Sequence, residues 1–115
     1  MTVVAIVLFV LAAVVVGTTV AATSGILKRN TIAGIRIPAL LSSDEAWEKG
    51  HQAALLPITI GGVIAVVGGI VLLVHPAGVV VVLIATIILF VALLSWGVLQ
   101  ATRTGLAIAR RSLDE

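Results

Sequence analysis

The feature that most constrains this chain is a stretch of 51 residues, from Gln52 to Thr102, that contains no Asp, Glu, Lys or Arg. One membrane-spanning helix needs about 20 predominantly apolar residues, so this stretch is long enough for two spans. Near its middle, the sequence His75-Pro76-Ala77-Gly78 combines a polar side chain, a helix breaker and a flexible residue, which predicts a tight turn. We therefore expect spans at residues 53–74 and 78–99.

Residues 3–22 form a further hydrophobic run of membrane length. No cationic residue precedes it, as the n-region of a secretory signal would require, so we interpret it as a retained first span; a signal cleaved near Ala22 is the alternative. The composition agrees, because 61% of the 115 residues are hydrophobic and only 10% are charged, against about a quarter in soluble domains. The sequence predicts an all-α membrane protein with three transmembrane helices in a single integral membrane domain, residues 1–115.

The charged residues gather in one loop and in the C-terminal tail. The 22 residues from Lys28 to Lys49 hold seven of the twelve charged side chains. All Lys and Arg residues lie in a loop at residues 28–52 or in a tail at residues 100–115, whose first part can continue as helix. The positive-inside rule assigns both segments to the cytoplasm and the N-terminus to the outside. Because the net charge is only +2, we expect attraction to membrane lipid and no direct binding of nucleic acid.

Small residues mark a packing face in the second predicted span. Gly61, Ala65 and Gly69 recur four residues apart, on one side of a helix. In a membrane such residues let another backbone approach closely. We interpret them as helix-packing positions, whose partner is another span of this chain or a second subunit, including a second copy in a homo-oligomer. The third predicted span is rich in Val, Ile and Leu and is expected to face lipid over much of its surface.

The sequence offers little support for transport or catalysis. No ionisable residue other than His75, at a boundary, falls in a predicted span, whereas ion-coupled carriers generally need buried charges. Glu48 and His51 are spaced like half of a di-metal carboxylate motif, but no matching ligands occur on other helices, and the chain has no cysteine. We also find no Gly-rich phosphate loop. We therefore predict no enzyme, no catalytic residue, no metal site and no cofactor.

Specific chemistry is concentrated in the loop. Residues 31–41 are too apolar for a freely solvated segment, so we expect them to fold back onto the membrane surface or the helix ends. Arg36 has apolar neighbours on both sides and should find a carboxylate or carbonyl partner, for which the same loop offers three carboxylates. The candidates are Asp44, Glu45 and Glu48.

A helix is predicted to begin near the end of this loop. Ser42 and Glu45 fit a capping box, and acidic residues are favoured in the first turn by the helix dipole. We expect the helix to lie along the membrane interface as far as Pro57, with Trp47 as its anchor among the headgroups. Pro57 either kinks one long helix or opens a separate span at its first turn.

The order of residues in the loop resembles the signature of the SdpI family of bacterial membrane proteins. The matching residues are Asn30, Gly34-Ile35-Arg36, Pro38, Ser43-Asp44-Glu45-Ala46-Trp47 and His51. Ile37 and Gln52 depart from the family, which commonly has a threonine and a basic residue there. The resemblance implies a protein of the bacterial inner (plasma) membrane that gives immunity to an exported toxin and, in one system, sequesters a transcriptional repressor. It also implies that eight residues form a partner-binding or structural motif: Asn30, Gly34, Arg36, Pro38, Asp44, Glu45, Trp47 and His51.

Two functions are compatible with these observations. The first is an immunity-type protein that binds a membrane-active toxin or a signalling partner through the cytoplasmic loop and the second and third spans. The second is a non-catalytic accessory subunit of a larger transporter or synthase complex in the cell envelope, docked through the Gly61 face or the third span. Toxin tolerance would distinguish the first function, and recovery of a complex with fixed stoichiometry would distinguish the second.

Overall fold

The computed structural model describes residues 2–30, 32–75 and 77–114, so Pro76 of the predicted turn lies outside the described residues. The described residues form four helices and no strand: α1 (Thr2–Thr23), α2 (Pro38–Leu41), α3 (Asp44–Val74) and α4 (Val79–Asp114). α1, α3 and α4 are each long and apolar enough to cross a membrane. The prediction of an all-α membrane protein is confirmed as to its helical class and its three helices able to span a membrane.

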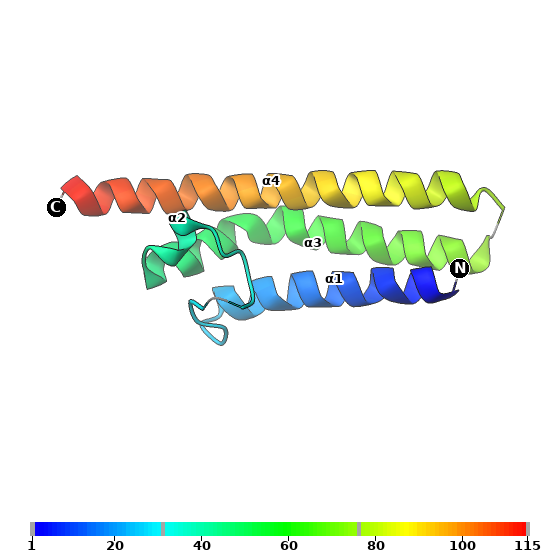
Figure 1. The fold of residues 1–115 in the computed structure, drawn as a ribbon, viewed down its shortest axis with the longest axis horizontal. Helices are drawn as coiled ribbons and strands as arrows, with labels where there is room; N and C mark the ends of the chain where they lie inside the picture. Colours follow the sequence, from blue (N-terminus) through cyan, green and yellow to red (C-terminus); the bar gives the residue numbers. More distant parts are fainter. Residues whose placement is uncertain (1, 31, 76, 115) are drawn as a thin grey trace.

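α3 and α4 are longer than one membrane crossing requires. At 1.5 Å per residue, their 31 and 36 residues extend about 46 and 54 Å, against a hydrocarbon core about 30 Å thick. The 22 residues of α1 extend about 33 Å and match that core. The start of α3 and the end of α4 lie at the same end of the molecule, together with the loop that follows α1 (Figure 1). The surplus helix therefore projects at the end that carries the charged residues.

α3 is a single helix that continues through Pro57. Proline has no N–H, so the carbonyl of Ala53 loses its usual partner four residues later. Membrane helices tolerate such a loss because neighbouring groups can satisfy the freed carbonyl. Of the two alternatives for this proline, the structure therefore shows the long helix and excludes a separate span that opens at Pro57.

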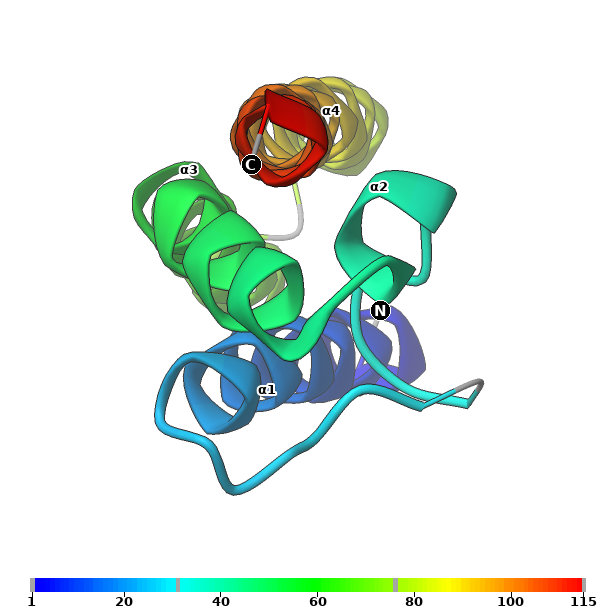
Figure 2. The ribbon, with the colours of Figure 1, turned by 90° about the vertical axis from the view of Figure 1, so that its left-hand side faces the viewer.

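α3 is the central helix of the bundle. It packs on α1 along one side and on α4 along the other, as the side and end views show (Figures 1 and 2). Among the described residues, no Cα of α1 lies within 8 Å of a Cα of α4. At the end opposite the N-terminus, the loop after α1 passes around that helix and leads to α2, which lies on the side between α1 and α4 (Figure 2). The bundle is therefore closed around α3 but open between its two outer helices.

The predicted packing residues of α3 lie inside this bundle. Gly61 faces Leu93 of α4, where an added Cβ would lie 3.4 Å away, and Gly69 faces Phe9 of α1, where it would lie 2.5 Å away. Ala65 is fully buried between them. Similar close approaches are made by Gly62 to Val16 of α1 and by Gly68 to Thr86 of α4. The small residues of α3 thus face the chain's own outer helices.

Candidate functional site

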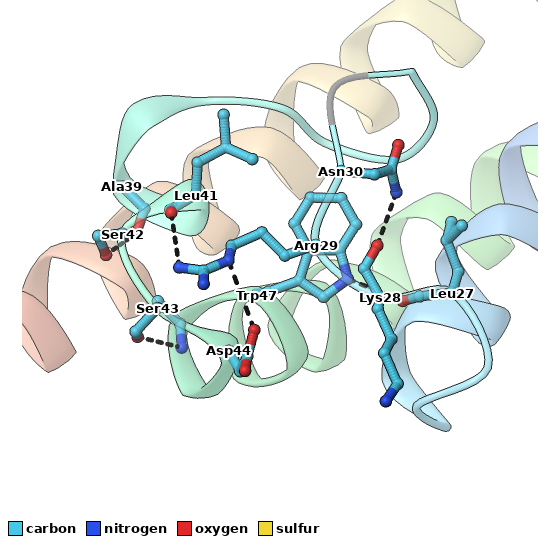
Figure 3. A network of polar contacts seen from close by, with 11 residues as sticks. Leu27, Lys28, Arg29, Asn30, Ala39, Leu41, Ser42, Ser43, Asp44 and Trp47 are labelled. Carbon is cyan, nitrogen blue, oxygen red and sulfur yellow. Dashed lines mark hydrogen bonds and ion pairs between the residues drawn. The ribbon is translucent and has the colours of Figure 1, made fainter.

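Trp47 connects the first two turns of α3 to the end of α1. Its indole Nε1 donates a hydrogen bond of 2.9 Å to the carbonyl oxygen of Leu27, in the loop that follows α1 (Figure 3). Only 1% of Trp47 is exposed. The prediction of an indole ring among lipid headgroups is therefore wrong for Trp47, because the loop after α1 covers the ring and supplies the acceptor that its N–H needs.

His51 connects α3 to the apolar loop. Its Nδ1 lies 2.6 Å from the carbonyl oxygen of Trp47, and its Nε2 lies 3.0 Å from the backbone nitrogen of Ile35. A carbonyl can only accept and a backbone N–H can only donate, so Nδ1 carries the proton and Nε2 is the acceptor. The ring is fully buried and lies against Trp47, with ring centroids 4.4 Å apart. His51 is thus a neutral imidazole with both nitrogens engaged.

Gly34 lies against both aromatic side chains. An added Cβ would be 2.8 Å from Cη2 of Trp47 and 3.1 Å from Nε2 of His51, which leaves no room for a side chain. The φ angle of Gly34 is +94°, a conformation that side-chain-bearing residues rarely adopt. Gly34, Trp47 and His51 therefore form one contact, although 17 positions of sequence separate the first from the last.

Asn30 and Pro38 shape the loop on either side of Gly34. Oδ1 of Asn30 accepts hydrogen bonds of 2.8 Å from the backbone nitrogens of Ile32 and Ala33, and its Nδ2 donates to the carbonyl of Lys28. This pattern lets a side chain satisfy backbone groups of a turn. Pro38 is the first residue of α2, where its fixed φ suits a helix start. Both residues act here on the conformation of the backbone.

Two further glycines hold α2 in place, and neither was singled out from the sequence. Leu40 of α2 is fully buried. An added Cβ at Gly50 of α3 would lie 2.7 Å from Leu40, and one at Gly105 of α4 would lie 3.0 Å from the carbonyl oxygen of Ala39. Only the occurrence of a glycine inside a helix could have suggested these contacts, because their partner α2 is four residues long and has no clear sequence signal.

The start of α3 lies one residue later than the capping box predicts. Ser43 is the N-cap, with an extended backbone and a side chain that accepts a hydrogen bond from the nitrogen of Ala46. Ser42 instead ends α2 in a helical conformation, and its hydroxyl donates to the carbonyl of Ala39. The prediction of Ser42 as the cap is wrong because a helical residue cannot occupy the extended N-cap position.

The acidic residues at this start pair with arginines. Arg29 Nε lies 3.4 Å from Asp44 Oδ1, and Arg29 also donates to the carbonyl of Leu41 (Figure 3). Glu45 pairs with Arg111 near the end of α4. Both pairs are largely exposed, with 82% of the Asp44 side chain and 52% of the Glu45 side chain accessible, so each contributes about 0–1 kcal/mol.

The eight predicted motif residues thus fall into two groups. The structure places Gly34, Trp47 and His51 in mutual contact, with Asn30 and Pro38 shaping the loop around them. The other three, Arg36, Asp44 and Glu45, are exposed. We refer to residues 24–51, which include the loop, α2 and the first turns of α3, as the motif module. The packing residues of α3 lie outside it, in the membrane bundle.

The part of the chain that the structure describes contains no group of three His, Cys, Asp or Glu residues able to hold a metal ion. The carboxylate of Glu48 lies beside Gly25, where an added Cβ would be 3.6 Å from Oε1. His51, three residues later, directs its ring nitrogens to backbone atoms. The motif module therefore has an interior held by side-chain-to-backbone hydrogen bonds and a charged exterior.

A comparison of the sequence with protein-family models gives a match over most of this region. The model of the SdpI/YfhL protein family matches residues 26–97, which include most of the motif module, the remainder of α3 and about half of α4. The comparisons with curated proteins and with solved structures gave no significant match.

Proposed function

The chain belongs to the SdpI/YfhL protein family, and from this membership and the geometry of the motif module we propose that it is a non-catalytic binding protein that gives resistance to a membrane-active peptide toxin. The multi-pass membrane architecture supports the setting, since α1, α3 and α4 can each cross a bilayer. In this proposal the motif module lies on the cytoplasmic face of a bacterial plasma membrane, with the N-terminus outside. All seven Lys and Arg residues are then on the cytoplasmic side, as the positive-inside rule favours.

The observation that carries the proposal is the division between the interior and the exterior of the motif module. Trp47 and His51 use their polar atoms to bind the backbone of the same module. The polar atoms of these two side chains therefore cannot bind a partner unless the motif module unfolds. Charged side chains outside remain accessible, namely Lys28, Arg36, Glu48 and Lys49. A toxin or a signalling protein is recognised by this exterior, and the buried motif residues keep the exterior in shape.

The proposal is tested by expressing the protein in bacteria that are sensitive to a panel of membrane-active peptides. We expect increased survival with the wild-type protein and loss of that increase with Arg36→Ala. Arg110→Ala is the matched control, because Arg110 is an exposed arginine on α4 outside the motif module. Equal amounts of each variant in the membrane fraction must be established first. Survival that does not change with the wild-type protein for any peptide would contradict the proposal.

An accessory subunit of a larger envelope complex is the second candidate, favoured by the surface of α4. Many of its large apolar side chains are exposed, including Val81 at 73% and Ile88 at 61%. The glycines of α3 are a weaker docking surface, since they already face α1 and α4. Co-purification from native membranes in mild detergent tests this candidate. A large membrane protein at fixed stoichiometry, lost with Ile88→Trp, would support it over the immunity role.

A further inference from the structure

A groove of about 440 Å³ lies between α1 and α4. Its walls include Val14 and Thr18 of α1 and Leu94 and Val98 of α4, and Ile58 of α3 forms part of its floor. Residues 32–35 of the motif module close one end. The groove exists because the outer helices pack on α3 without approaching each other (Figure 2). Its position between two membrane-spanning helices opens it toward the hydrocarbon of the bilayer.

The hydroxyls and several backbone nitrogens in the lining are already engaged. The hydroxyls of Thr18 and Thr19 donate hydrogen bonds of 2.8 Å to carbonyls of the preceding turn of α1. At the closed end, the nitrogen of Ala33 donates to Asn30 and that of Ile35 donates to His51. An occupant therefore meets mainly apolar surface and is held by dispersion contacts, which an empty groove would lose.

The size of the groove selects a flexible chain over a helix. A helix with its side chains is about 10–12 Å wide and rises 5.4 Å per turn, so each turn takes up roughly 400–600 Å³. A helix enclosed within the groove could therefore be only about one turn long. Its volume falls in the range of about 300–1,000 Å³ that is typical of sites for small ligands. A hydrocarbon chain can follow the narrow space between the helices.

The charges of the protein indicate which lipid supplies that chain. The sequence has no Lys, Arg, Asp or Glu in residues 1–27 or from Gly50 to Thr102, so charged residues are confined to the end where the motif module closes the groove. The seven Lys and Arg residues there outnumber the acidic residues, and the chain has a net charge of +2. Arg36 directly follows Ile35, which is part of the lining. From this placement we infer that the groove holds one acyl chain of an anionic phospholipid, whose phosphate lies among the cationic residues of the motif module. This inference does not depend on a role in toxin resistance.

Trp47 provides a reporter for the occupant. Its ring lies directly behind Gly34, which lines the groove, and it is 1% exposed, so lipid elsewhere on the surface does not touch it. Trp96 is 45% exposed and is replaced by phenylalanine, so that Trp47 alone fluoresces. The Trp96→Phe protein is reconstituted into phosphatidylcholine vesicles that contain an equal fraction of either phosphatidylglycerol or phosphatidylcholine with brominated acyl chains, which quench tryptophan at short range.

We expect at least twofold stronger quenching by brominated phosphatidylglycerol than by brominated phosphatidylcholine. Val14→Phe, which fills the groove, should abolish the difference. Val10→Phe should retain it, because Val10 is also on α1 and equally exposed, at 54% against 55% for Val14. Val98→Phe fills the groove from α4 and is the groove-filling variant to use if Val14→Phe does not fold.

Three results would overturn the inference. One is equal quenching by the two lipids. Another is an unchanged difference in a folded groove-filling variant. Relief of quenching by a hydrophobic transmembrane peptide, where excess unbrominated phosphatidylglycerol gives none, would identify the groove as a protein-docking surface and would likewise overturn it.

Discussion

In the motif module, buried polar side chains bind backbone atoms of segments far away in the sequence, as Trp47 binds Leu27 and His51 binds Ile35. In the membrane bundle, the hydroxyls of Thr19 and Thr86 return to carbonyls four residues earlier in their own helices. The bundle is instead fitted together by glycines that admit a neighbouring side chain. The module also contains close-packed glycines, Gly34 and Gly50. The difference teaches that the module depends in addition on the chemistry of particular polar residues, whereas the bundle depends mainly on size.

The largest expected effect is that of Trp47→Ala. It removes a large buried side chain and leaves the carbonyl of Leu27 without its donor, so we expect a loss of about 3–5 kcal/mol of stability. Unfolding in detergent micelles and proteolysis of the loop after α1 measure it. Trp96→Ala is the control, because Trp96 is 45% exposed. Similar losses for both variants would show that the module is not a specific structure.

Gly34→Ala should come next. The new Cβ would contact Trp47 and His51. The backbone of the alanine would also have to adopt a φ near +94°, which costs about 1–3 kcal/mol from backbone strain alone. In α1, Gly17 has nothing within 4 Å of an added Cβ, so Gly17→Ala should be neutral or stabilise by up to about 1 kcal/mol. Thermal unfolding of the two variants compares them. A loss of stability with Gly34→Ala and an unchanged or increased stability with Gly17→Ala would support the account. An unchanged stability with Gly34→Ala would refute it.

A substitution of one polar residue in each region tests the comparison directly. His51→Phe keeps a buried ring but leaves the N–H of Ile35 without an acceptor, which should cost about 1–3 kcal/mol. Thr86→Val removes only a bond within one helix turn and should cost less, at most about 0.6 kcal/mol, which is the average for side-chain hydrogen bonds between membrane helices. Unfolding midpoints in the same detergent decide the order. An equal or reversed order would contradict the distinction between the regions.

The smallest expected effect is that of Glu45→Gln, which removes the ion pair with Arg111. Both side chains are about half exposed, so the change should cost about 0–1 kcal/mol and should vanish at high salt. Stability measured at low and at high ionic strength tests this. A loss above about 2 kcal/mol that persists in salt would mean that this pair, and not the buried residues, holds α4 to the motif module.

The fold was largely predictable because its signal is local. The charge-free stretch indicates two spans, and α3 ends at Val74, the last residue of the predicted second span. The start of α3 was less predictable. Ser42 and Ser43 are both good caps, and Ser43 is selected only because Ser42 is the C-cap of α2, a helix that the sequence does not reveal.

The motif was recognisable as a pattern, but the role of each residue was not. Nothing near Trp47 in the sequence indicates that the loop after α1 will cover its ring, because that contact joins segments 20 residues apart. The same holds for Gly105, whose partner is the backbone of α2. The sequence therefore indicates which residues are unusual in their local context, whereas tertiary contacts decide which of them are buried.

The most direct test of the account is the nitrogen-15 NMR spectrum of the His51 imidazole in the folded protein in detergent micelles. The geometry predicts a single neutral tautomer at neutral pH, with the proton on Nδ1 bound to the carbonyl of Trp47 and with Nε2 accepting from Ile35. A protonated Nε2, or a ring that exchanges between tautomers as an exposed histidine does, would contradict this account. The His51 ring nitrogens would then not both be bound by backbone atoms of the motif module.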